Sequence, residues 1–238
     1  KRALDIFGKS NENITNKFPI DKNMTFNNKY RCKITAIFVD IRKSTSLFKE
    51  GEKDLSTPKI IRCFTSEAVE ILNSGGGEKE IGIRGDCVYG IYHTPNDGDV
   101  LEVMEKARFI NTLIAMLNSL FEDNSLKPLK VGIGISTSTV IAVKAGRENS
   151  GIDDIVWIGE AVAGASNLSF HGSKGKLKKQ SIVVSSATYN IVIKQYKKKY
   201  GKKAESWFDE RELNQTLAYS SNLMDDDMSI WIEKGMKD

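Results

Sequence analysis

The sequence predicts an α/β (α+β) fold, in which a mostly antiparallel sheet carries helices on its faces. Two observations lead to this prediction. Short apolar runs typical of strands alternate along the chain with segments whose apolar residues recur at helical spacing. Several expected strands follow one another through short turns, which is typical of hairpins and therefore of an antiparallel sheet.

The first half of the chain contains the clearest elements. A buried strand is expected at 33–41, where apolar residues are nearly continuous. Pro58 marks the first turn of a helix, which ends at the three glycines 75–77. Two strands, 79–84 and 87–92, are then expected to form a hairpin.

The second half begins with a long helix at 98–121, whose apolar residues lie along one side. Segments 130–136 and 139–145 are expected to form a second hairpin. The remaining elements are shorter, and in chain order they are a strand at 155–158, a helix at 160–170, a strand at 182–184 and a helix at 186–200. The tail is expected to hold one or two strands, of which the clearest is at 228–232.

The composition predicts one domain. The chain has 238 residues without an internal repeat or a low-complexity linker, so we expect a single domain at 30–238, preceded by a polar, Asn-rich extension at 1–29. With 35 basic and 31 acidic residues the charge is too balanced for a surface that coats nucleic acid. No long apolar run or signal peptide is visible, and three cysteines lack metal-ligand spacing, which predicts a cytoplasmic protein outside the membrane.

Two carboxylates at the ends of apolar strands are the best candidates for a site. Asp40 ends the strand 33–41, and Asp86 lies in the turn of the hairpin that follows. For either residue alone, a turn former or a helix cap is the more ordinary interpretation. Held together at the tips of two rigid elements, they would share a pair of divalent cations, Mn²⁺ or Mg²⁺, a common arrangement for displacement at phosphorus. The backbone carbonyl of Ile41 would be a further oxygen ligand.

The residues that follow the first acid have the character of a phosphate cradle. Cations, hydroxyls and backbone N–H groups come directly after a strand, in the order Arg42, Lys43, Ser44 and Thr45. The serine and the threonine would equally cap the next helix, and the two interpretations are compatible. Arg84, just before the second acid's turn, would contact a phosphate or a base, or pair with a nearby acid.

These motifs carry a resemblance to the class III nucleotidyl cyclases, most closely to the pyrimidine cyclases of bacterial anti-phage (Pycsar) systems. Segment 38–45 resembles the first metal motif of this family, and Gly85-Asp86 resembles the second. Segment 131–135 is similar to the central strand, 157–168 to the glycine-led helix, and 182–189 to the strand and helix that follow. The matching segments occur in the order that the family has.

The resemblance implies a ferredoxin-like core and a head-to-tail homodimer with shared active sites. Asp40, Ile41 and Asp86 would bind two Mn²⁺ or Mg²⁺ ions, and residues of the partner subunit would complete each site. The reaction would be attack of the ribose 3′-hydroxyl on the α-phosphorus with loss of pyrophosphate. In an anti-phage system, the cyclic nucleotide would activate a separate effector.

The glycine-led helix departs from the family pattern at two positions. The family's Asn and Arg, four residues apart, fall on Ala163 and Asn167, so a cation that would stabilise the developing phosphorane is missing. Asn167 stays a catalytic candidate beside Asp40, Asp86 and Arg84. The cations that are candidates to replace the arginine are Arg42, Arg84, Lys174 and Lys176.

The positions that read purines in adenylate and guanylate cyclases also depart. They are occupied by Gly82 and Val156, neither of which can hydrogen-bond to a base edge. UTP is therefore the expected substrate, with CTP left open. Tyr30 and Arg42 are candidates to contact the base, although packing and an ion pair are their more ordinary roles.

Two other interpretations stay open. One is an adenylate cyclase with unusual base-reading residues. The other is a degenerate cyclase fold, kept as a nucleotide-binding or dimerisation module, which Ala163 and Asn167 favour. The presence of both Asp40 and Asp86 favours an active enzyme.

Overall fold

The computed structural model describes residues 4, 7–8, 14–15, 18, 24–44 and 56–236. Its strands are β1 (Ile14–Thr15), β2 (Lys29–Ile41), β3 (Glu78–Arg84), β4 (Cys87–His93), β5 (Val131–Arg147), β6 (Ile152–Ile158), β7 (Ile182–Ser185), β8 (Asp209–Leu213) and β9 (Thr216–Ser221). Its helices are α3 (Ser56–Asn73), α4 (Asp97–Asp123), α5 (Glu160–His171), α6 (Ser186–Tyr200) and α7 (Asp226–Glu233), with 3₁₀ helices η1 (Gly175–Leu177) and η2 (Gly201–Trp207).

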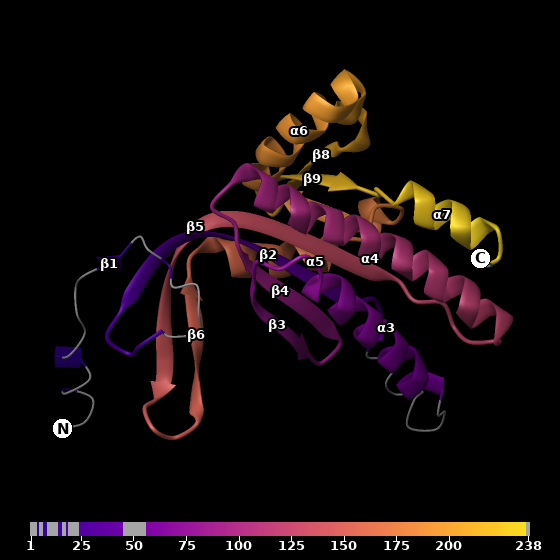
Figure 1. Ribbon diagram of the computed structural model, residues 1–238. Coiled ribbons are helices and arrows are strands. Elements are labelled where there is room, and N and C mark those ends of the chain that lie inside the picture. The colour runs from indigo at the N-terminus through magenta and orange to yellow at the C-terminus, as the bar shows by residue number, and fades with distance from the viewer. Residues whose placement is uncertain are drawn as a thin grey trace.

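The described strands form one sheet, along which β3, β4, β2, β5, β7, β9 and β8 follow in this order. Neighbours are antiparallel except for the pairs β1–β2 and β5–β7, which are parallel. The predicted α/β fold with a mostly antiparallel sheet is therefore confirmed. β2 and β5 are the longest strands, and the distal half of β5 continues with β6 into a hairpin that projects from the rest of the molecule (Figure 1).

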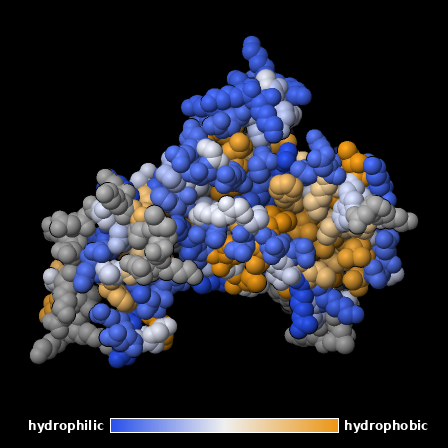
Figure 2. All heavy atoms as spheres, in the orientation of Figure 1, coloured by the Kyte–Doolittle hydropathy of each residue, from blue (hydrophilic) through white to orange (hydrophobic). Residues whose placement is uncertain are grey.

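Helices cover the two faces of the sheet unequally. α3, α4 and α6 pack on one face, where Phe64, Met104 and Val192 belong to one large buried cluster. α5 packs on the other face through Ala161 and Ala165. Figure 1 shows α3 and α4 side by side, and in Figure 2 apolar side chains gather where α4 lies beside α3 and α7, whereas hydrophilic ones cover α6. Within the described ranges, no helix has both the length and the apolarity that crossing a membrane requires.

A chain of buried hydroxyl groups crosses the middle of the sheet. Thr35 on β2 lies 2.9 Å from Thr94 and 2.9 Å from Thr137 on β5, oxygen to oxygen. Thr137 is in turn 2.9 Å from Thr188 of α6, which contacts Ser185 at 2.9 Å. These bonds satisfy polar groups that would be costly to bury alone. The predicted hairpin of 130–136 and 139–145 is wrong, because both segments belong to the single continuous strand β5, in which Thr137 lies between them.

The backbone of α5 packs directly against the backbone of β5, without a side chain between them at Gly134. A Cβ atom built on Gly134 would come within 2.0 Å of the Ala165 carbonyl oxygen and 2.2 Å of the Ser169 nitrogen. At Gly132 a Cβ would meet the Arg42 side chain at 1.5 Å. Glycine at these two positions is therefore what allows the helix to sit on the strand and the arginine to pass beneath its end.

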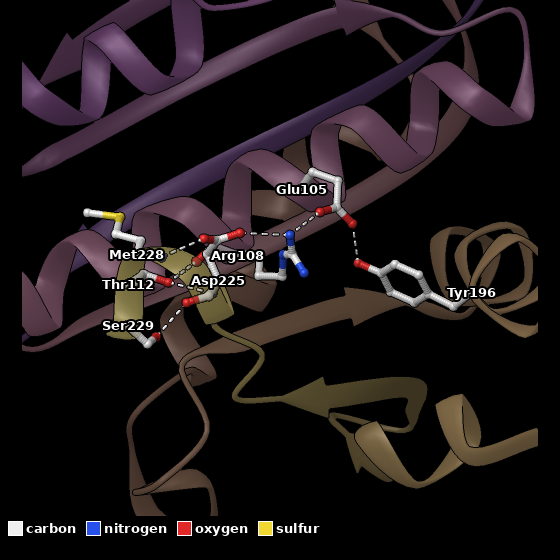
Figure 3. Close-up of polar contacts among 7 residues, drawn as sticks. All are labelled: Glu105, Arg108, Thr112, Tyr196, Asp225, Met228 and Ser229. Atoms are coloured by element: carbon white, nitrogen blue, oxygen red, sulfur yellow. Dashed lines mark hydrogen bonds and ion pairs between the residues drawn. The ribbon is translucent and has the colours of Figure 1, made fainter. Parts of the chain in front are cut away.

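The C-terminal segment is a helix, which corrects the prediction of a strand at 228–232. The Asp225 carboxylate caps α7, because its Oδ1 accepts from the Met228 amide at 2.9 Å. Its Oδ2 accepts from Arg108 of α4 at 2.9 Å, and its amide donates to Thr112 at 2.8 Å (Figure 3). α7 buries no residue fully, so these polar contacts account for much of its attachment to α4.

Replacing Asp225 with Ala should loosen α7 without unfolding the domain. The change removes an N-cap and the half-buried partner of Arg108, each of which contributes about 1 kcal/mol. We expect exchange of the α7 backbone amides with deuterium to accelerate at least about tenfold. Asp227→Ala is the matched control, since it removes an exposed acid from the same helix turn and should change exchange far less. Equal exchange in both variants would show that the cap does not attach the helix.

Candidate active site

The two predicted acids lie at one end of the sheet, where β2 ends beside the turn between β3 and β4. Asp40 is the penultimate residue of β2, between Cys87 of β4 and Gly132 of β5. Asp86 lies in the turn between β3 and β4, and its carbonyl oxygen accepts from the Ile41 amide at 3.4 Å. The hairpin turn is thus fastened to the end of β2. Each acid is placed by a paired strand, as the sequence predicts.

Several effects act on the pKa of the Asp40 carboxyl. Burial raises the pKa of its carboxyl, the guanidinium of Arg42 lowers it, and the negative charge of Asp86 raises it again, with a net shift upward. A bound cation would stabilise the charged form of Asp40, which burial and the nearby negative charge disfavour. The sign sets a pH window: metal binding at Asp40 weakens as pH falls toward this raised pKa.

The donor set fits divalent cations. Two carboxylates and nearby backbone carbonyls are oxygen ligands, which Mg²⁺ and Mn²⁺ prefer. In the part of the chain that the structure describes, no group of three or more His, Cys, Asp or Glu side chains could hold a metal ion, so the two acids would need backbone, phosphate or water oxygens to complete the coordination. Asp40, Asp86 and the Ile41 carbonyl would hold the metal, and remaining positions would be left for phosphate oxygens and water.

Arg42 connects the first acid to the end of α5. Its Nη1 donates to Asp40 Oδ2 at 2.6 Å, its Nε donates to the Gly172 carbonyl at 2.8 Å, and its Nη2 donates to the Ser169 carbonyl. The Arg42 side chain is only 6% exposed, whereas that of Asp40 is 27% exposed. A cation at the carboxyl end of a helix satisfies carbonyls that lack helical partners. All three guanidinium nitrogens are used by the protein, so this side chain positions Asp40 and α5.

A cleft of about 760 Å³, the central cleft, opens beside Asp40 on the face that α5 covers. It is lined by Phe38, Asp40, Glu80, Arg84, Cys87, Tyr89, Ile91, Asp154, Ile155, Val156, Trp157, Val162, Ser166, Asn167, Ser169 and Phe170. The cleft therefore brings together four predicted site residues, namely Asp40, Arg84, Val156 and Asn167. Gly82 lies directly beside it, because a Cβ there would be 2.5 Å from the Tyr89 ring.

A second, basic cleft of about 610 Å³ lies beyond Arg42. Three separate segments supply its charged residues, which are Arg42, Lys43, Lys127, Lys130, Lys174 and Lys178. Lys174 lies 3.4 Å from the centre of the Phe170 ring, and burial together with the charge of Arg42 lowers the pKa of its ammonium group. Among the described residues that line this cleft none is acidic, so it suits a polyanion.

Other predicted residues lie elsewhere. The structure does not bring Tyr30 to either cleft. This residue is buried near the start of β2, and its ring packs edge-on against Phe18 with the ring centroids 5.8 Å apart. Ten residues of strand, roughly 33 Å, separate it from Asp40. Lys176 is exposed on η1 and does not line the basic cleft. Ser44 is half-buried after the turn, and Thr45 lies outside the described residues.

Most residues of two groups that line the clefts were not predicted from the sequence. Lys127 and Lys130 lie in the loop before β5, and single lysines next to a strand carry no distinctive signal. Lys178 belongs to the basic run 174–179, for which the sequence left contact with a polyphosphate open. Glu80, Tyr89 and Trp157 are brought together by three strands. The period-2 alternation of β3 and β4 would have placed the first two on the same face as Asp40, which was the available signal.

Comparison with known proteins gives a consistent result. A family model described as the adenylate and guanylate cyclase catalytic domain matches residues 27–207. A uridylate cyclase from Treponema porcinum is 42% identical over 243 residues, which cover 100% of this chain and 80% of that protein. A uridylate cyclase from Gulbenkiania mobilis is 35% identical over 151 residues, which cover 61% of this chain and 58% of that protein.

A solved structure agrees in fold. The adenylyl cyclase CyaB from P. aeruginosa has a TM-score of 0.62 and 21% sequence identity, over 81% of this chain and 95% of that one. At this identity the likeness concerns the arrangement of strands and helices.

Proposed function

Because the chain belongs to the adenylate and guanylate cyclase catalytic domain family, we propose that it is a uridylate cyclase, which converts UTP to 3′,5′-cyclic UMP and pyrophosphate. Membership confirms the predicted resemblance to class III cyclases and the enzyme class, a nucleotidyl cyclase. The observation that carries the choice of UTP is the 42% identity, over the whole chain, to a protein named uridylate cyclase. The side chains at 82 and 156, which cannot read a purine, support it.

The reaction would join the ribose 3′-oxygen to the α-phosphorus while the bond to the β-phosphate oxygen breaks and pyrophosphate leaves. Divalent cations, which enzymes of this family use, supply Lewis-acid stabilisation of the reacting oxygens when bound. The role of Asp40 and Asp86 is to hold these ions at the end of β2, beside the turn between β3 and β4. Arg42 keeps the Asp40 carboxylate fixed through a bond of 2.6 Å, so little reorganisation is needed during reaction.

The basic cleft would accept the β- and γ-phosphates and then the pyrophosphate. Arg42, which lines this cleft, is bonded to Asp40, so negative charge that develops on the leaving group would meet the positive charge of the cleft. Lys174 is the best candidate to compensate for the missing arginine of the glycine-led helix. Its position in the basic cleft and its electrostatic interaction with Asp40 support this assignment. Lys43 would contact the phosphates from the turn after β2.

A homodimer would complete the site. Exposed apolar side chains occur on the elements around the central cleft, including Ile83, Val156, Ile158 and Phe170. A second copy that covers them would gain hydrophobic stabilisation. In the head-to-tail arrangement, the metal end of each cleft would face the base-binding end of its partner. Cyclic UMP would then act as a second messenger that activates a separate effector in anti-phage defence.

Incubation with each of the four ribonucleoside triphosphates and Mn²⁺ tests the proposal. We expect cyclic UMP from UTP, identified by mass spectrometry, and a much lower yield from CTP, ATP and GTP. Product from ATP alone would instead establish an adenylate cyclase with unusual base-reading residues. No product from any triphosphate would favour the nucleotide-binding module, which the alanine at 163 and the missing arginine at 167 suggest.

A further inference from the structure

Three side chains form a hydrogen-bonded cluster in the central cleft. Glu80 of β3 accepts from the Tyr89 hydroxyl at 2.7 Å through Oε1. Its Oε2 accepts from the Trp157 indole nitrogen at 3.0 Å. The Tyr89 ring stacks on Phe38, with centroids 5.1 Å apart and an interplanar angle of 13°. The cluster joins β3, β4 and β6 and faces the same cleft as Asp40.

The carboxylate of Glu80 is oriented and still has acceptor capacity. Each carboxylate oxygen can accept about two hydrogen bonds, and one is used on each. The two donors stay protonated near neutral pH, because indole does not titrate and burial beside Glu80 raises the pKa of Tyr89 to about 12. A fixed anionic acceptor in a cleft selects for a donor on its ligand.

Gly82 and Tyr89 shape the wall next to this acceptor. The Tyr89 ring lies over Gly82, where a Cβ would be 2.5 Å from its atoms, so it takes the space that a larger residue would fill. Phe38 and Trp157 line the same cleft and add flat apolar surface to it. A planar base would stack against such surfaces while its edge meets the Glu80 carboxylate.

We propose that Glu80, held by Tyr89 and Trp157, determines specificity by accepting the N3–H of uracil, an inference that rests on the proposed function. Uracil has a donor at N3, whereas cytosine has a lone pair there, which a carboxylate repels. Arg84 lines the same cleft and has donors for a uracil carbonyl. In the proposed dimer, this cluster would read the base of a triphosphate whose metal ions are held by the partner.

Methylated substrates test the proposal with the unaltered full-length protein. 3-Methyl-UTP lacks the N3 proton, and we expect its kcat/KM to be at least about tenfold below that of UTP, since a hydrogen bond to a charged group is lost. 5-Methyl-UTP is the matched control, because its methyl group is remote from N3, and it should be turned over within a few-fold of UTP. Equal turnover of UTP and 3-methyl-UTP would overturn the inference, whatever the behaviour of any variant.

Glu80→Gln identifies the acceptor. The amide can donate to cytosine N3 as well as accept from uracil, so the ratio of kcat/KM for UTP to that for CTP should fall at least about tenfold. A purely structural role would lower both rates together and leave the ratio unchanged, which would overturn the assignment. Glu67→Gln, an exposed change on α3, is the control. If the unaltered protein uses no pyrimidine, the proposed function and this inference fail together, whereas an unchanged ratio removes only the inference.

Discussion

Replacing Asp40 or Asp86 with Ala should lower the UTP turnover of the enzyme by at least ~10³-fold, because each change removes a carboxylate from the candidate metal site. Titration of Mn²⁺ followed by electron paramagnetic resonance should show weaker binding in both variants. This readout does not depend on turnover. Asp123→Ala, at the exposed end of α4, is the control and should change neither quantity. Mn²⁺-dependent turnover that persists in both variants would contradict the metal assignment.

The two variants should differ in stability. Asp86 lies in a turn and has no ion pair among the described contacts, so its loss should cost little. Loss of Asp40 leaves the 6%-exposed Arg42 side chain without its anionic partner, although two carbonyls still accept from it. We expect Asp40→Ala to lower the free energy of unfolding by about 1–3 kcal/mol, which denaturant titration would measure.

Gly134→Ala should strongly destabilise the fold. The new methyl group would overlap the Ala165 carbonyl oxygen and the Ser169 amide nitrogen, which are backbone atoms of α5 and cannot move alone. Overpacking typically costs 1–3 kcal/mol, and we expect about 3 kcal/mol or more here. Displacement of α5 would also withdraw the carbonyls that hold Arg42, so turnover should fall as well.

Gly98→Ala is the matched control for this change. Gly98 lies in the first turn of α4, no atom would lie within 4 Å of its Cβ, and alanine favours a helix. Thermal unfolding should therefore show a large decrease in Tm for Gly134→Ala and an equal or slightly higher Tm for Gly98→Ala. Equal Tm values for both variants and the parent would mean that α5 does not press on β5 as described.

Much of the fold could be predicted from local patterns. The helix at 186–200 and the hairpin strands around Gly85 are confirmed because periodicity and turn residues agreed there. The prediction of a strand at 228–232 was wrong, because the apolar residues of this segment imitate a strand. The deciding contact is the N-cap of α7, in which the Asp225 carboxylate accepts from the Met228 amide. β8 and β9 were missed, although Asn214 and Gln215, both with positive φ, form the kind of turn that joins hairpin strands.

The candidate site could be predicted only in part. Asp40 and Asp86 could be predicted as a pair, because the first lies at the end of an apolar strand and the second lies in the turn of the hairpin that follows. The role of Arg42 depends on the carbonyls at 169 and 172, which no local pattern places beside it. The prediction for Tyr30 treated nearness in sequence as nearness in space, although a strand carries residues apart at about 3.3 Å each.

The buried threonine chain limits how the two longest strands can move. Each hydroxyl has a single proton to give, so the direction of one bond fixes that of the next and the bonds strengthen one another. Slippage of β5 along β2 by one residue would turn Thr137 to the opposite face. The hydroxyls of Thr35 and Thr188 would then be left without this partner in an apolar interior. The hydroxyl chain therefore fixes the register of the two strands, and the same register holds Asp40 opposite Gly132 of β5.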